Sequence, residues 1–69
     1  MPYRQTPSTQ AARARRRAAL LGAARQIVAT EGFGAASVRA VTAAAGVSPG
    51  TLYGYFGTLD ELLAQVFRQ

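Results

Sequence analysis

The sequence contains no cysteine and no histidine, and its 69 residues include only three acidic side chains, Glu31, Asp60 and Glu61. Without cysteine there is no disulfide framework and no thiolate metal site. With no histidine and three carboxylates, the chain has almost nothing from which to build a hydrolytic or metal-dependent active site. We therefore predict that the protein is not an enzyme and uses no cofactor or metal.

Long apolar runs are also missing. No stretch reaches the ~20 residues that a membrane-spanning helix needs, and the N-terminus lacks the apolar segment of a signal peptide. The absence of cysteine suits a reducing cytosol, so we expect a cytoplasmic protein associated with the nucleoid and not with a membrane. The length allows one small domain at most.

Positive charge is what the sequence has in excess. The net charge is +5, and all eight basic residues are arginines. Arginine presents a planar fork that matches phosphate groups and the guanine edge. A small basic domain of this kind favours a polyanionic partner, either nucleic acid or an acidic membrane surface. The membrane alternative is weaker because the apolar stripe beside the arginines is needed for the core.

We expect residues 1–15 to form a flexible basic arm, because two prolines and several polar residues precede a dense run of arginines. The run has two interpretations that stay open here. It is either a solvated charge run or an arm that follows phosphates or enters a minor groove. Arg16 and Arg17, at the end of the run, are candidate DNA contacts.

Residues 16–57 are expected to form a three-helix bundle, which makes the fold all-α. The first helix should run from about Arg13 or Arg17 to Thr30, and Gly32 should end it, with Phe33 folding back onto its apolar side. Its apolar stripe recurs at three- and four-residue spacing and consists of Leu20, Leu21, Ala24, Ile27 and Val28.

Two short helices follow, each with a clear start. Ser37 is a good N-cap for a helix over 38–45 that ends at Gly46. Ser48 caps the next helix, in which Pro49 takes the first position. At residues 58–69, Thr58 and Glu61 have the spacing of a capping box and begin a fourth helix. Because its apolar pattern is still running at the last residue, we expect this helix to lead to a further C-terminal domain.

The second and third helices, joined by a tight glycine turn, fit a helix-turn-helix. In that motif one helix braces the other, which lies in the major groove of DNA. If Leu52 and Phe56 point inward, a rotation of about 100° per residue leaves Gly50 and Gly54 pointing most directly outward. Thr51 and Tyr53 then fall on opposite flanks, and Tyr55 falls beside Thr51.

The residues also show a resemblance that covers residues 16–63. This part closely resembles the N-terminal DNA-binding domain of the tetracycline-repressor (TetR/AcrR) family, whose motifs occur here in order and at the family spacing. The matching residues are Ala23-Ala24, Glu31-Gly32-Phe33, Ser37-Val38, Ala45-Gly46-Val47-Ser48, Thr51-Leu52-Tyr53 and Tyr55-Phe56.

The resemblance implies a bacterial transcription factor, usually a repressor, that binds double-stranded DNA at palindromic operators as a homodimer. It implies that dimerisation and a small-molecule effector site lie in a C-terminal domain outside these 69 residues. It also implies a set of DNA contacts, of which the aromatic and basic members keep alternative roles in packing or as solvated side chains. With the two arginines above, the candidate DNA-binding residues are Ser37, Arg39, Ser48, Pro49, Gly50, Thr51, Tyr53 and Tyr55.

Three residues depart from the family pattern. Leu59 stands where a phosphate-contacting lysine is usual, Gly54 replaces a larger residue, and Thr42 lies where alanine is common. Losing one phosphate contact weakens binding and lowers its salt dependence. The alternative function is therefore a truncated regulator that acts as an interaction module and binds DNA only non-specifically.

Overall fold

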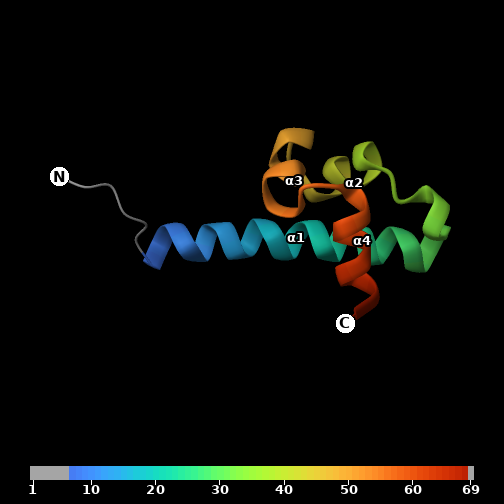
Figure 1. Cartoon of the computed structure of the whole chain (residues 1–69), viewed down its shortest axis with the longest axis horizontal. Coiled ribbons are helices and arrows are strands. Elements are labelled where there is room, and N and C mark those ends of the chain that lie inside the picture. The colour runs from blue at the N-terminus through green and yellow to red at the C-terminus, as the bar shows by residue number, and fades with distance from the viewer. Residues whose placement is uncertain (1–6, 69) are drawn as a thin grey trace.

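The computed structural model describes residues 7–68, which form helices joined by short turns (Figure 1). The prediction of an all-α fold is confirmed, since these residues contain no strand. The elements in chain order are α1 (Pro7–Glu31), the 3-10 helix η1 (Phe33–Ala35), α2 (Val38–Ala45), α3 (Pro49–Phe56) and α4 (Leu59–Arg68).

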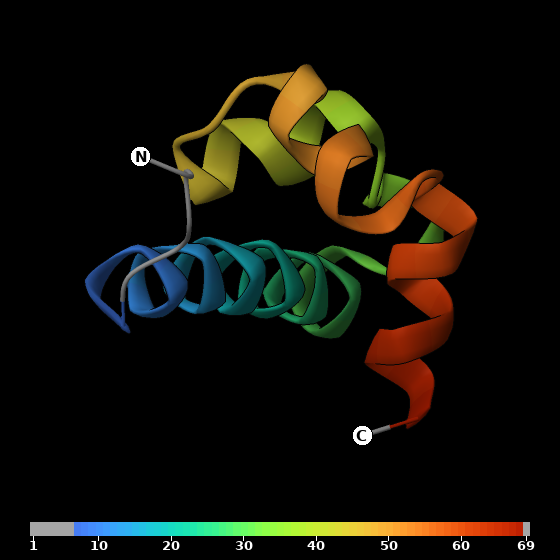
Figure 2. The same ribbon diagram turned by 60° about the vertical axis from the view of Figure 1, so that its left-hand side comes forward.

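The long helix α1 is the base on which the shorter helices are assembled. It packs against η1, α2 and α4, while α3 packs against α2 and α4. Figure 2 shows α2 and α3 lying over one side of α1, with α4 descending past it at the edge of the bundle. The N-terminal part of α1 projects beyond this bundle (Figure 1).

The start of α1 corrects one sequence prediction. The helix begins at Pro7, so the prediction of a flexible arm over residues 1–15 is wrong for residues 7–15, and the predicted helix start at Arg13 or Arg17 is too late. Alanine and arginine, which dominate this stretch, are both strong helix formers. Residues 1–6 of the predicted arm lie outside the described residues.

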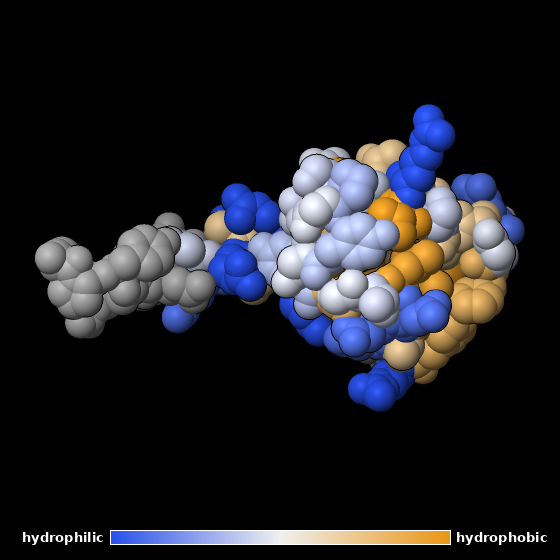
Figure 3. Space-filling view, turned by 45° about the horizontal axis from the view of Figure 1, so that its top comes forward, coloured by the Kyte–Doolittle hydropathy of each residue, from blue (hydrophilic) through white to orange (hydrophobic). Residues whose placement is uncertain are grey.

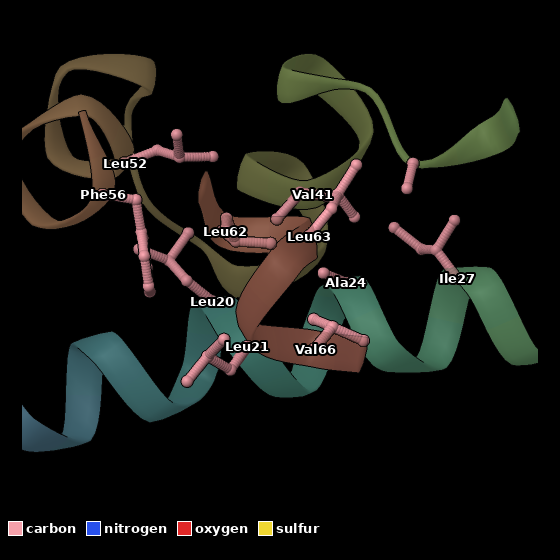
Figure 4. Packing of buried hydrophobic residues seen from close by; sticks show 11 residues of the cluster. Leu20, Leu21, Ala24, Ile27, Val41, Leu52, Phe56, Leu62, Leu63 and Val66 are labelled. Carbon is pink, nitrogen blue, oxygen red and sulfur yellow. The ribbon is translucent and has the colours of Figure 1, made fainter. Parts of the chain in front are cut away.

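The core joins all four α-helices (Figure 4). Leu52 and Phe56 of α3 are 0% and 2% exposed, which confirms their predicted inward orientation. Figure 4 shows the Phe56 side chain reaching toward Leu20 of α1. The other buried apolar residues are Leu21, Ala24, Ile27, Ala36, Val41, Leu62, Leu63 and Val66.

Side-chain caps start the short helices as predicted. The Ser37 hydroxyl accepts a hydrogen bond from the backbone N–H of Ala40 at 3.0 Å. The Ser48 hydroxyl accepts one from the N–H of Thr51 at 3.3 Å. Between the two helices, Gly46 adopts the left-handed conformation with φ 74°, which glycine enters at little cost. The turn of the helix-turn-helix is thus fixed by local chemistry.

Phe33 does not fold back onto the apolar stripe of α1, so that prediction is wrong. Its side chain is 56% exposed, and its ring lies 5.4 Å from the ring of Phe67 in an edge-to-face arrangement. Gly32, with φ 95°, directs the chain into η1, and this places Phe33 beside the end of α4. Phe67 is itself 61% exposed, so the pair forms a small apolar patch on the surface.

Candidate nucleic-acid interface

The residues that α3 buries in the core determine which of its sides faces solvent. Because Leu52 and Phe56 are buried one helical turn apart, the opposite side of the helix faces solvent. Tyr53 is 49% exposed, and its phenol is the largest polar group that α3 offers to a partner. The helix thus presents polar tips and bare backbone on its outer side, as predicted from the spacing.

The first turn of α3 groups four of the predicted site residues. Ser48, Pro49 and Gly50 are exposed, and Thr51 is half-buried. The hydroxyl oxygens of Ser48 and Thr51 lie 3.1 Å apart and share a hydrogen bond. Ser48 therefore uses its hydroxyl within the protein, both for the cap and for Thr51, and it holds the Thr51 side chain in one position.

Tyr55 is held at the edge of the core. Its side chain is half-buried and packs against the core cluster. On its other side, the guanidinium carbon of Arg13 lies 4.8 Å from the centre of its ring. Cation–π contacts of this geometry attract the two groups. The ring of Tyr55 thus takes part in packing, the alternative to DNA contact that the sequence left open, while a DNA contact by its hydroxyl stays a prediction.

Arg16 and Arg17 are placed differently, although they are neighbours in the sequence. Arg16 is exposed on α1. Arg17 is half-buried, its guanidinium carbon lies 5.0 Å from the centre of the Phe56 ring, and it donates a hydrogen bond to the side-chain oxygen of Gln65. Arg17 thereby joins α1 to both α3 and α4. The guanidinium group of Arg17 thus makes its contacts within the protein, whereas the side chain of Arg16 is exposed to solvent.

The start of α2 brings Ser37 and Arg39 to the surface, and both are exposed. Backbone N–H groups at a helix start carry partial positive charge, so a cation and a positive helix end lie together here. Beneath them, Thr42 is 3% exposed, and its hydroxyl donates a hydrogen bond to the carbonyl of Val38 at 2.7 Å. The polar group of Thr42 is therefore satisfied inside α2, and the departure from alanine is compatible with a buried position.

Leu59, the first residue of α4, is half-buried and packs against the core cluster. A lysine at this position would extend past the same apolar contacts with its ammonium group in solvent. The Thr58 hydroxyl accepts a hydrogen bond from the N–H of Glu61 at 3.1 Å, as the predicted cap requires. At position 59, leucine thus supplies apolar contact where a lysine would supply a positive charge.

The charge around these helices favours an anionic partner. Neither α2 nor α3 contains an acidic residue, and hydrophilic side chains line the projecting part of α1 (Figure 3). Within residues 7–68, no group of three histidine, cysteine or acidic side chains could hold a metal ion. None of the helices in this range is both long and apolar enough to cross a membrane.

The sequence does not predict three contacts, which are that of Arg13 with Tyr55 and those of Arg17 with Phe56 and with Gln65. The basic run gives Arg13 no individual role, and no pattern in the sequence assigns one to Gln65. The signal that could have found Arg13 is its spacing from Arg17, because residues four apart lie on one side of a helix. That spacing shows that the two arginines point the same way. It does not show that the aromatic rings of α3 lie opposite them.

A solvent-facing helix, braced by a second helix across a glycine turn and contacted by two arginines of α1, defines a helix-turn-helix DNA-binding domain. The comparison with known proteins agrees with this class. The family model for "Bacterial regulatory proteins, tetR family" matches residues 20–66, and the chain belongs to this family. The resemblance stated from the sequence is thereby confirmed.

Curated relatives belong to the same class. Over 53 residues the chain is 38% identical to the HTH-type transcriptional regulator UidR of Escherichia coli (strain K12). The aligned residues make up 77% of this chain and 27% of that protein. The regulator of the same name from Shigella flexneri gives the same identity and coverage. The chain thus spans about a quarter of the length of the curated relatives it matches. No solved structure matches it.

Proposed function

We propose that this domain binds an operator in double-stranded DNA with α3 in the major groove, and that it serves a transcriptional repressor. The observation that carries the proposal is the outward face of α3, which Leu52 and Phe56 leave in solvent. An α-helix of this kind fits the width of the major groove, and α2 braces it from behind.

The predicted residues divide into two kinds of contact. Thr51, Pro49 and Gly50 lie in the first turn of α3, the part of a recognition helix that reaches base edges in this motif. Arg39 is long enough to reach either a guanine edge or a phosphate. Phosphate contacts position the protein and carry no sequence information directly, and the residues proposed for that role are Ser37, Ser48, Tyr53, Tyr55 and Arg16. Arg17, whose guanidinium group bonds Gln65, is proposed to act on the fold instead.

The rest of the regulator is proposed on the resemblance and on the length of the relatives. Two copies would bind a palindromic operator as a homodimer, joined through a C-terminal domain that also takes a small-molecule effector. Two helix-turn-helix units then contact half-sites one helical turn of DNA apart, about 34 Å. Since operators lie in chromosomal DNA, the site of action would be the bacterial cytoplasm.

Selection of binding sites from a random DNA pool tests the proposal. Two copies of the domain are joined by a flexible linker, and bound duplexes are enriched and sequenced. We expect a palindromic consensus and an affinity for it at least about 10³-fold above that for random duplex. Equal affinity for both, abolished by moderate salt, would instead support the alternative of an interaction module that binds DNA non-specifically.

A further inference from the structure

Two glycines form the outermost line of α3. Gly50 and Gly54 are four residues apart, so they lie on one side of the helix, and both are exposed. At about 100° per residue, this side is opposite the buried Leu52 and Phe56. The outermost line of the helix is therefore bare backbone.

The fold itself does not require a glycine at either position. Positive φ angles occur at Gly32, Gly46 and Gly57, and not in α3. A Cβ atom added at Gly54 would have no neighbour within 4 Å, and one added at Gly50 would meet the Ser48 hydroxyl at 3.8 Å, an ordinary contact. Neither backbone conformation nor packing within residues 7–68 explains the two glycines.

Gly54 nevertheless weakens the helix. It lies in the interior of an eight-residue helix, where glycine is less favourable than alanine because it loses more backbone freedom on folding. What distinguishes Gly54 from Gly22, the other helical glycine where a Cβ would meet no neighbour, is its place on the exposed side of α3, opposite the buried Leu52 and Phe56. A glycine at that place leaves room for a partner outside the protein. The use of glycine that fits is close approach of the backbone to another surface.

We propose that Gly54, together with Gly50, lets the backbone of α3 approach the base edges of double-stranded DNA, so that Gly54 determines how deeply the helix enters the groove. This inference rests on the proposed function. A methyl group at position 54 would stand between the backbone and the floor of the groove. The helix would then lie further from the DNA. Tyr53 on one flank, which is 49% exposed, and Thr51 on the other would be too far from the DNA to keep their contacts.

The test compares two glycine-to-alanine variants in the 69-residue chain, Gly54→Ala and Gly22→Ala. Gly22 lies inside α1, and a Cβ there also has no neighbour within 4 Å, so it is a matched control for helix stability. Both variants are expected to raise the melting temperature by about 4–8 °C. Fluorescence anisotropy then measures the affinity of each for the selected duplex and for random duplex.

Gly54→Ala is expected to bind the selected duplex about tenfold more weakly than the unsubstituted chain, the scale of one mismatched base pair. Its affinity for random duplex should change by less than about twofold, because non-specific binding depends mainly on positive charge, which the substitution leaves unchanged. Gly22→Ala should keep both affinities within about twofold. Gly50→Ala is expected to follow Gly54→Ala.

Two outcomes would overturn the inference while leaving the proposed function intact. Gly54→Ala could bind the selected duplex as tightly as the unsubstituted chain, or it could lose affinity equally for both duplexes. The proposed function fails in a different way, in which the unsubstituted chain shows no preference for any selected sequence over random duplex. The inference then falls with it.

Discussion

The guanidinium group of Arg13 covers the ring of Tyr55, with 4.8 Å between the guanidinium carbon and the ring centre. One helical turn further along α1, Arg17 repeats the arrangement over Phe56 at 5.0 Å. Two arginines of the first helix therefore bind the C-terminal half of α3, the helix proposed to enter the groove. We call Arg13 and Arg17, with Tyr55 and Phe56, the arginine clamp.

Removing either arginine of the clamp should destabilise the domain. We expect Arg13→Ala to lower the free energy of unfolding by about 0.5–1 kcal/mol, the range for an exposed cation–π contact. Arg17→Ala should cost more, about 1–2 kcal/mol, because the half-buried guanidinium also bonds Gln65. Urea unfolding followed by circular dichroism measures both.

Arg15 supplies the control for these variants, since it lies on the same helix and is exposed. Arg15→Ala should change the free energy of unfolding by less than about 0.5 kcal/mol. If the three variants are equally stable, the clamp does not contribute to the fold.

Arg16 and Arg17 should differ in how they affect DNA binding. Arg16→Ala is expected to reduce the slope of log affinity against log salt concentration by about one, because one phosphate contact is lost. Arg17→Ala should act mainly through stability, with the slope preserved where the domain is folded. Anisotropy titrations at several salt concentrations give the slopes. An unchanged slope for Arg16→Ala would show that Arg16 does not contact a phosphate. A reduced slope for Arg17→Ala would show that Arg17 contacts a phosphate in addition to its structural role.

Leu59→Lys should raise the affinity for DNA and steepen its salt dependence. A lysine stem can keep part of the packing that Leu59 makes against the core, while its ammonium adds a phosphate contact. Leu59→Met is the matched control, because it keeps apolar contact and adds no charge. Equal affinities of the lysine and methionine variants at both low and high salt would show that the start of α4 lies away from the phosphates.

Ser37→Asp should separate helix capping from DNA binding. Aspartate caps helices as well as serine does, so the hydrogen bond now accepted from Ala40 should be kept and stability should hold. Its negative charge would repel a phosphate, and we expect a loss of affinity of about tenfold, or ~1.4 kcal/mol. Ser37→Ala provides the contrast, since it should cost about 1 kcal/mol of stability. If Ser37→Asp binds DNA normally, the start of α2 does not face a phosphate.

Much of this domain was predictable because its signals are local. The caps at Ser37 and Ser48 and the turn at Gly46 each depend on residues within one helical turn. The inward direction of Leu52 and Phe56 follows from helical periodicity alone. The prolines and polar residues near the N-terminus predict a flexible arm, but α1 begins at Pro7 because the alanines and arginines that follow have high helix propensity.

The sequence by itself determined the class of fold, the places where the short helices begin, the side of α3 that is buried and, through ordered motifs, the family. These depend on spacing along the chain. Only the tertiary structure decided which arginines are engaged within the protein, that Phe33 meets Phe67 on the surface, and that Arg17 reaches Gln65, 48 residues away. Such contacts depend on how whole helices cross, and that is set by the packing of the core as a whole.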